Sequence, residues 1–193
     1  MKTIDIIVPC YNEQEVLSTF YKTTQEIVQA IPDCSFHYIF VDDGSHDDTL
    51  LILKGLKATY ESVDYISFSR NFGKEAAMYL SNSQGDYVIV MDADLQHPPL
   101  LIPEMVKAVN EGFDCCAAYR TNRKGEAPIR SFLSRQFYKV NNMLTSVKMP
   151  YGAVDFRMMS RQMVDSIVAM SEAQRFSKGI FSYVGFETKW IPY

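Results

Sequence analysis

The stretch YVIVMDADLQHPP, at residues 87–99, indicates the class of fold. It begins with the apolar run Tyr87–Met91, which is typical of a buried β-strand. A D-A-D triplet follows, and the pair Pro98-Pro99 introduces a helix predicted over Leu100–Asn110. An apolar strand that ends in polar residues and leads into a helix is the repeating unit of α/β proteins.

The same unit recurs on both sides of this stretch. Further strands are predicted over Thr3–Pro9, Phe36–Val41, Val63–Phe68 and Phe113–Tyr119, and helices over Glu13–Ala30, Asp47–Tyr60 and Gly73–Ser83. The strands are almost continuously apolar, which is expected when helices cover both faces of a sheet. We therefore predict an α/β fold with a mostly parallel, Rossmann-like sheet and helices on both faces.

The pattern changes after Tyr119. A polar loop precedes a helix predicted over Ile129–Val147, in which cationic residues alternate with aromatic ones. That helix either packs in the core or lies near lipid headgroups. A short strand or loop is predicted over Asp155–Met159, a helix over Arg161–Met170 and a β-like tail over Phe181–Pro192.

Charge is unevenly distributed along the chain. The 193 residues suit one domain, and a hydrophobic fraction of 47% argues against general disorder. The formal net charge of −4 gives no indication of nucleic-acid binding. Residues 1–118 hold 7 Lys and Arg against 18 Asp and Glu, whereas residues 119–193 hold 12 against 5. The acidic part suits a metal and the basic part suits phosphates or an anionic membrane surface, unless both are solvated faces.

The sequence shows no targeting or membrane-spanning segment. No apolar run approaches the ~20 residues that cross a bilayer, and the N-terminus lacks the pattern of a signal peptide. We expect this chain by itself to be soluble and cytoplasmic. The cysteines form no C-x-x-C pair, so we expect reduced, mostly buried thiols at Cys10, Cys34, Cys115 and Cys116.

The D-A-D triplet is the strongest functional signal. Alternate residues of a strand point to the same side, so the carboxylates of Asp92 and Asp94 are predicted to lie together. Two close carboxylates repel unless a cation joins them, and oxygen ligands suit Mg²⁺ or Mn²⁺. The alternative is that Asp94 only caps the helix that follows.

The second predicted strand ends in the motif DDGS, at residues 42–45. A turn at Gly44 and capping of the next helix by Ser45 or Asp47 explain part of this motif without a ligand. They do not explain Asp42, which ends an apolar strand. We predict that Asp42 accepts hydrogen bonds from a nucleobase or ribose, with Asp43 as a further candidate.

Several other site motifs are missing from the sequence. No G-x-G-x-x-G follows the first strand, and no P-loop occurs. The histidines have no G-x-S-x-G partner that would indicate a serine hydrolase. His37 is predicted to be packed or at the surface and His46 to lie in a turn. His97 either lines the site or, as we favour, enters the next helix.

Five motifs together resemble glycosyltransferase family 2, whose members have the GT-A fold. They are VPCYNE at 8–13, VDDGSHDDT at 41–49, SRNFGKEAA at 69–77, MDADLQHPP at 91–99 and DFRMMSR at 155–161. The resemblance extends over nearly the whole chain. It is closest to the polyprenyl-phosphate branch, which includes bactoprenol glucosyltransferases and dolichol-phosphate mannose synthases. It implies a single GT-A catalytic domain, in which residues 1–118 bind nucleotide and metal and residues 119–193 face the acceptor.

The resemblance also implies roles for individual residues. The residues expected to hold the donor nucleotide are Pro9, Tyr11, Glu13 and Asp42, and the DDGS motif adds Asp43 as a candidate. The residues expected at the diphosphate and its Mg²⁺ or Mn²⁺ ion are Asp92, Asp94 and Gln96. The arginines expected to bind phosphate are Arg120 and Arg135, with Arg157 and Arg175 as further candidates.

The implied reaction moves a sugar from a nucleoside diphosphate, UDP rather than GDP, to a polyprenyl phosphate with inversion at the anomeric carbon. A phosphate acceptor is already anionic near neutral pH and needs no general base. The candidate catalytic residues are Asp94, Asp155 and Arg120. Asp155 acts as a base, orients Arg157 or the acceptor, or forms a buried ion pair with Arg157 or Arg161.

Two other functions stay open. One is transfer to a saccharide hydroxyl, which requires a base, and the other is a catalytically silent sugar-nucleotide-binding domain. Members of this branch usually continue into interfacial and transmembrane helices. We therefore expect a longer parent protein at the cytoplasmic side of the cell membrane, with the membrane surface as a partner. Self-association into a homo-oligomer is common in the branch and stays open here.

Overall fold

The computed structural model describes residues 1–73, 79–121, 152–170, 181 and 184–193. The strands are β1 (Lys2–Cys10), β2 (Cys34–Asp42), β3 (Val63–Ser67), β4 (Tyr87–Val90), β5 (Cys115–Tyr119), β6 (Ala153–Ser160) and β7 (Thr188–Pro192). The helices are α1 (Leu17–Val28), α2 (Thr49–Thr59), α4 (Ile102–Asn110), α6 (Arg161–Val168) and the short 3-10 helix η1 (Pro99–Leu101). The helix predicted over Ile129–Val147 lies outside the described residues, as does the first half of the one predicted over Gly73–Ser83. None of the described helices has both the length and the hydropathy needed to cross a membrane.

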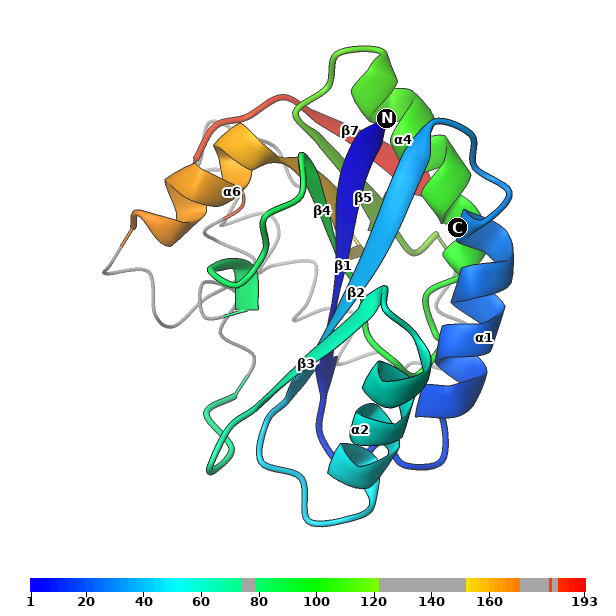
Figure 1. The fold of residues 1–193 in the computed structure, drawn as a ribbon. Helices are drawn as coiled ribbons and strands as arrows, with labels where there is room; N and C mark the ends of the chain where they lie inside the picture. The colour runs from blue at the N-terminus through cyan, green and yellow to red at the C-terminus, as the bar shows by residue number, and fades with distance from the viewer. Residues whose placement is uncertain (74–78, 122–151, 171–180, 182–183) are drawn as a thin grey trace.

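The strands form one sheet in the order β3-β2-β1-β4-β6-β5-β7. β1 pairs in parallel with β2 on one side and β4 on the other, and β2 pairs in parallel with β3. Among the described strands β6 alone is reversed, between β4 and β5, and β7 pairs in parallel with β5. The carboxyl ends of the other strands and the first residues of β6 therefore meet at one edge of the sheet (Figure 1), which confirms the predicted mostly parallel sheet.

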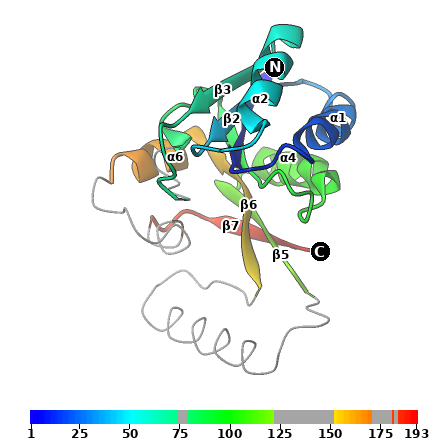
Figure 2. The same ribbon diagram turned by 90° about the horizontal axis from the view of Figure 1, so that it is seen from below.

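Helices cover both faces of the sheet, as predicted (Figure 2). One face packs against α1, α2 and α4 through buried side chains such as Phe20, Leu53 and Met105. The opposite face packs against α6 through Met163 and Ile167. The central strands are almost continuously apolar in sequence, because alternate side chains pack into the two cores on opposite faces of the sheet.

The first helix begins later than predicted. α1 begins at Leu17 and not at Glu13. The backbone N–H of Glu13 donates to the Thr49 hydroxyl (2.8 Å), and that of Gln14 donates to the Asp47 carboxylate (3.2 Å). These bonds hold the residues after β1 against the loop after β2, so the chain turns before it enters the helix.

The turn after β2 is also fixed to the loop after β3. The Asp43 carboxylate, 5% exposed, accepts the N–H groups of Phe72 (2.8 Å) and Gly73 (2.9 Å). The Arg70 backbone passes directly over Gly44, where an added Cβ would lie 2.6 Å from the Arg70 carbonyl carbon. Gly44 has a φ of 73°, which glycine adopts without strain. The loops after β1, β2 and β3 therefore form one connected unit.

We expect Gly44→Ala to lower the free energy of unfolding by about 2 kcal/mol or more, because its Cβ meets backbone atoms at a left-handed φ. The matched control is Gly55→Ala. Gly55 lies inside α2 with nothing within 4 Å of an added Cβ, so alanine there should raise the stability by up to about 1 kcal/mol. Urea unfolding of both variants measures the difference, and shifts in the same direction would contradict the assigned roles.

A charged network lies across the first three strands, away from the edge described above. His37 Nδ1 is 3.7 Å from Asp5 Oδ1, and its Nε2 is 3.0 Å from Asp64 Oδ2. Lys57 Nζ lies 2.5 Å from the other oxygen of Asp64. His37, Asp5 and Asp64 line a cavity of about 670 Å³. Asp5 raises the pKa of His37 against the effect of burial, and Asp64 adds to the rise.

Replacing His37 by Gln should remove a pH-dependent part of the stability. The folded-state pKa of His37 is raised, so its ion pairs stabilise fully below the unfolded value of about 6.5 and are lost as the pH rises through the folded value. The imidazole is partly exposed, so we expect H37Q to cost about 1 kcal/mol or less near pH 5.5 and nothing near pH 9. Urea unfolding at both pH values checks this, and an equal loss at both would show that the effect is not electrostatic.

Candidate active site

Acidic side chains converge where β1, β2 and β4 end. Cys10, the last residue of β1, is 2% exposed. Burial raises the pKa of its thiol, and the negative charges of Glu13, Asp42 and Asp92 raise it further. These carboxylates are far apart in the sequence, yet all act on one thiol. The structure therefore brings together predicted site residues from three strand ends.

Asp42 and Asp43 are both buried and bonded within the protein. Asp42, 1% exposed, accepts the Ser45 N–H (3.0 Å) on Oδ1 and the Ser67 hydroxyl (2.9 Å) on Oδ2. Asp43 holds the loop after β3, a role that the DDGS motif gave no means of predicting because its partners lie about thirty residues away. Contact of either carboxylate with a nucleoside stays a prediction.

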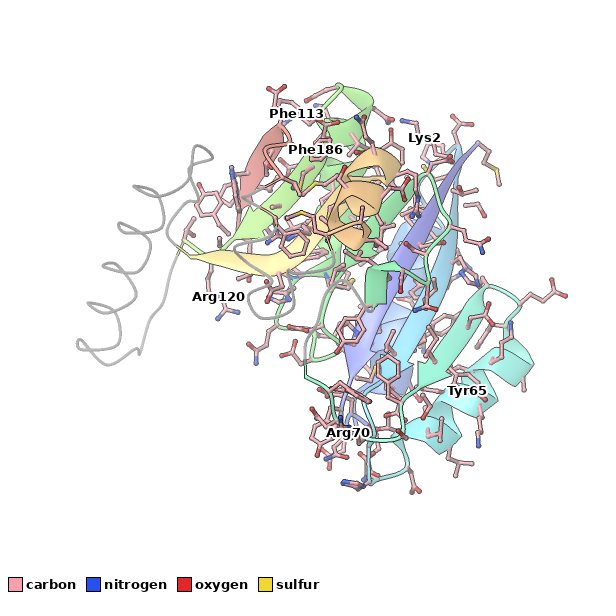
Figure 3. All side chains as sticks on the ribbon, turned by 90° about the vertical axis from the view of Figure 1, so that its left-hand side faces the viewer. Lys2, Tyr65, Arg70, Phe113, Arg120 and Phe186 are labelled. Carbon is pink, nitrogen blue, oxygen red and sulfur yellow. The ribbon has the colours of Figure 1, made fainter. Side chains whose placement is uncertain are left out.

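Aromatic side chains are exposed at the same edge. Tyr11, in the loop after β1, is 43% exposed, and Pro9 and Glu13 are half-buried beside it in the chain. Phe72 is 40% exposed, and the Arg70 guanidinium lies over its ring at 4.6 Å. Figure 3 shows Arg70 at the end of the sheet opposite Lys2. Neither Arg70 nor Phe72 was predicted as a site residue, although both directly follow the third strand.

The D-A-D triplet lies in a turn and not in a strand. β4 ends at Val90, Leu95 has a φ of 56°, and the Asp94 carboxylate accepts the N–H of Gln96 (3.0 Å). The reasoning that strand alternation places Asp92 and Asp94 on one side was therefore wrong, because the chain leaves the sheet before Asp92. The triplet still lies at the predicted edge.

The oxygen atoms in this turn suit a hard divalent cation. Asp94 and Gln96 are exposed and Asp92 is half-buried, and carboxylate and amide oxygens are ligands that Mg²⁺ and Mn²⁺ accept. The described residues contain no group of three or more His, Cys, Asp and Glu side chains that could hold a metal. A cation here would take further ligands from water or substrate, as is typical of Mg²⁺ at phosphate sites.

His97 packs beside the same turn. It is 7% exposed, its ring stacks on Phe156 with centroids 5.8 Å apart, and it meets the edge of Tyr193 at 6.2 Å. The N-cap of η1 is Pro98 and not His97, which gives no support to the favoured helix-entry role. Burial lowers the pKa of His97, against three nearby carboxylates that raise it, while Arg120 lowers it further. Those carboxylates belong to Asp92, Asp94 and Asp155.

Arg120 follows β5 at this edge (Figure 3). Its N–H donates to the Gly152 carbonyl (2.9 Å), and its guanidinium lies 5.7 Å from the centroid of the Tyr193 ring. The Tyr193 N–H donates to Tyr119 (3.1 Å), and its carbonyl accepts the Thr121 N–H (2.9 Å). Tyr193 is thus fixed beside His97 and Arg120, a position that no sequence signal indicated.

Asp155 and Arg157 lie on β6 without forming an ion pair. No nitrogen of Arg157 or Arg161 lies within 4 Å of the Asp155 carboxylate in the described chain, so the buried-pair alternative is wrong for both. Asp155 Oδ1 is buried and has no hydrogen-bond partner in the part of the chain that the structure describes. Arg157, 3% exposed, donates to the Val154 carbonyl (3.1 Å) and lies 3.8 Å from the Phe181 ring centroid.

Arg135 and Arg175, two of the predicted phosphate-binding arginines, lie outside the described residues. Their roles stay predictions. The other predicted site residues come from β1, β2, β4, β5 and β6, and all but the buried Arg157 lie at or beside the shared edge of the sheet.

Sequence relatives share nearly the whole of this chain. A putative glycosyltransferase, CsbB, of Bacillus subtilis (strain 168) is 45% identical over 192 residues, which cover 98% of this chain and 58% of the relative. A bactoprenol glucosyl transferase of Shigella phage SfV is 36% identical over 192 residues, covering 98% of this chain and 62% of the relative. The chain thus spans about three-fifths of the length of these relatives.

Solved structures of low sequence identity share the fold. The mannosyltransferase PcManGT from Pyrobaculum calidifontis, in complex with GDP-Man and Mn²⁺, has a TM-score of 0.67 at 17% identity, covering 98% of this chain and 54% of that one. S. aureus TarS 1–349, in complex with UDP, has a TM-score of 0.67 at 16% identity, covering 99% and 58%. These similarities confirm the predicted GT-A fold.

The comparison with protein families agrees with the motifs at the strand ends. The model of the family described as "Glycosyl transferase family 2" matches residues 5–168, from β1 to the last residue of α6. With this match over most of its length and with the GT-A fold, the chain belongs to glycosyl transferase family 2.

Proposed function

We propose that this chain is the catalytic domain of an inverting glycosyltransferase that moves a sugar from a UDP-sugar to a polyprenyl phosphate. The observation that carries the proposal is the convergence of Glu13, Asp42 and Asp92 at the strand ends of a family 2 chain. Relatives named bactoprenol glucosyl transferase support a lipid phosphate as the acceptor. Because these relatives are longer, the activity is proposed for the whole protein.

The donor is proposed to lie along the edge from β2 to β4. The exposed ring of Tyr11 is placed to stack on a base, and the half-buried Glu13 adjoins it. The diphosphate would reach the turn of Asp92 and Asp94. TarS was solved with UDP and PcManGT with GDP-Man, so this fold accommodates either base, and the bactoprenol relatives favour UDP.

A divalent cation is proposed at Asp92, Asp94 and Gln96. When bound, Mg²⁺ or Mn²⁺ would stabilise the negative charge of the departing diphosphate as a Lewis acid. PcManGT was solved with Mn²⁺, which supports metal use in this fold. Arg120, at the end of β5, would add positive charge to the same region, where a planar guanidinium suits phosphate oxygens.

The acceptor is proposed to be a phosphate and not a hydroxyl group. A phosphate monoester near neutral pH is anionic and attacks without losing a proton. Asp155 then serves to orient ligand groups, and its charge would oppose close approach of the phosphate. The basic composition of residues 119–193 supports a position near anionic lipid headgroups, on the cytoplasmic side of the cell membrane in the parent protein.

Calorimetric titration tests the nucleotide and the metal together. We expect UDP to bind more tightly than GDP, and Mn²⁺ to tighten UDP binding by at least about tenfold. Asp94→Asn should remove the effect of Mn²⁺, because the amide does not provide the negative charge that a hard cation favours.

The control for that titration is Asp33→Asn, an exposed aspartate before β2 at the opposite end of the sheet. It should bind UDP and Mn²⁺ as the unmodified chain does. Tighter binding of GDP than of UDP would indicate a GDP-sugar such as GDP-mannose as the donor. A UDP affinity that does not change when Mn²⁺ is added would exclude the proposed metal site.

Asp155→Asn separates the two kinds of acceptor. With a polyprenyl phosphate in detergent, we expect transfer to fall by about tenfold or less, because no base is required. Loss of a general base from a hydroxyl-directed enzyme typically costs about 10²–10⁴-fold. A loss of that size, with UDP binding intact in calorimetry, would favour a saccharide hydroxyl as the acceptor.

A further inference from the structure

Buried polar atoms without partners gather at one part of the strand-end edge. In the described residues, eight buried side-chain nitrogen or oxygen atoms lack a hydrogen-bond partner. Four of them lie in α1 and β2, away from this edge. Three of the other four belong to His97, Asp155 and Tyr193, which come from three separate segments beside the D-A-D turn, and the fourth is Nε of Arg157, which lies further along β6 against the Phe181 ring. Buried polar groups are normally paired with protein, water or a ligand, so this cluster marks a place where a polar partner binds.

His97 and Tyr193 hold their polar atoms in fixed positions. The His97 ring is stacked on Phe156 and meets Tyr193 edge-on, and His97 is 93% buried because its exposed fraction is 7%. Tyr193 is held by backbone hydrogen bonds on both sides of its residue and lies under the Arg120 guanidinium. Neither side chain can turn to find a partner elsewhere without losing this packing. A partner for His97 Nδ1 and Tyr193 Oη must therefore reach these atoms in their present positions.

The chemistry of these atoms selects the class of ligand. A neutral imidazole nitrogen and a phenol oxygen each donate or accept, whereas a carboxylate such as Asp155 only accepts. A phosphate offers acceptor oxygens and would leave Asp155 Oδ1 unpaired. Sugar hydroxyl groups both donate and accept, and so match all three side chains.

We propose that His97, Tyr193 and Asp155 form the subsite that binds the hydroxyl groups of the donor sugar. This inference rests on the proposed function, because it places a nucleotide-linked sugar next to the turn of Asp92 and Asp94. The sugar is attached to the diphosphate, so it must lie beside the groups that hold that diphosphate. His97 follows Asp94 by three residues, and Tyr193 lies next to Arg120. These side chains would therefore decide which sugar the enzyme accepts.

Two variants remove the polar atoms and keep the rings. His97→Phe retains an aromatic ring over Phe156, and Tyr193→Phe retains the ring under Arg120. The matched control is Tyr38→Phe, because the Tyr38 hydroxyl is also buried and unpartnered but lies in the core between α1 and the sheet. Thermal unfolding of each variant checks that the fold is kept. Y193F and Y38F then differ only in where the lost hydroxyl group lay, and H97F removes the imidazole nitrogens.

The measurement is the affinity for UDP and for UDP-glucose with Mn²⁺, by calorimetry, and for GDP and GDP-mannose if the chain prefers GDP. We expect H97F and Y193F to bind the nucleotide within about twofold of the unmodified chain and the nucleotide sugar about tenfold more weakly. We expect the ratio of the two affinities in Y38F to match that of the unmodified chain. UDP-galactose and UDP-N-acetylglucosamine extend the test to the choice of sugar, and their order of affinity should change in H97F and Y193F only.

Other outcomes overturn the inference in distinguishable ways. An unchanged ratio in H97F and Y193F, or an equal loss of nucleotide and nucleotide-sugar binding, would exclude a sugar subsite while leaving the proposed function in place. Unchanged donor affinity with loss of transfer alone would assign these side chains to the acceptor. An unmodified chain that binds neither UDP nor GDP would overturn both the proposed function and this inference.

Discussion

β1 is hydrogen-bonded in parallel on both sides, to β2 along Lys2–Cys10 and to β4 along Ile4–Ile7. Parallel neighbours end at the same edge of a sheet, so the loops that leave these strands meet whatever their separation in the sequence. The thiol of Cys10 lies within the influence of three such loops. The candidate site thus depends first on the backbone ladder of β1, and only then on individual side chains.

The same arrangement brings several carboxylates to one edge of the sheet, and their negative charge is compensated in two ways. Asp42 and Asp43 are buried, and their oxygens accept hydrogen bonds from N–H and hydroxyl groups of neighbouring loops. A buried carboxylate is tolerated only when such donors compensate for the loss of water. Asp94 instead remains exposed in its turn, where water or a cation compensates its charge. The buried carboxylates therefore fix the loops, and the exposed one stays available to a ligand.

Much of the fold was predictable from the sequence because its strands are apolar runs that end in polar turns, a pattern set by local residues. The start of α1 was not predictable in this way, because Glu13 and Gln14 are hydrogen-bonded to the side chains of Thr49 and Asp47 after β2. The motifs correctly indicated the edge of the sheet at which the site lies. The prediction that strand alternation places Asp92 and Asp94 on one side failed, because the strand ends before Asp92. His97 was undervalued because its burial depends on Phe156 and Tyr193, which lie far along the chain.

The two parts of the strand-end edge differ in how completely their polar groups are satisfied. Around β1, β2 and β3, cross-loop hydrogen bonds satisfy the turn carboxylates and fix the loops. Around β4, β6 and β7, buried atoms of His97, Asp155 and Tyr193 have no hydrogen-bond partner among the described residues, which costs about 1–3 kcal/mol for each atom left unpaired. An apolar side chain of similar shape would avoid that cost in the free protein. In the described residues, the turn carboxylates of the first part are thus hydrogen-bonded within the protein, whereas the second part leaves polar atoms to which the sugar hydroxyl groups proposed above would bind.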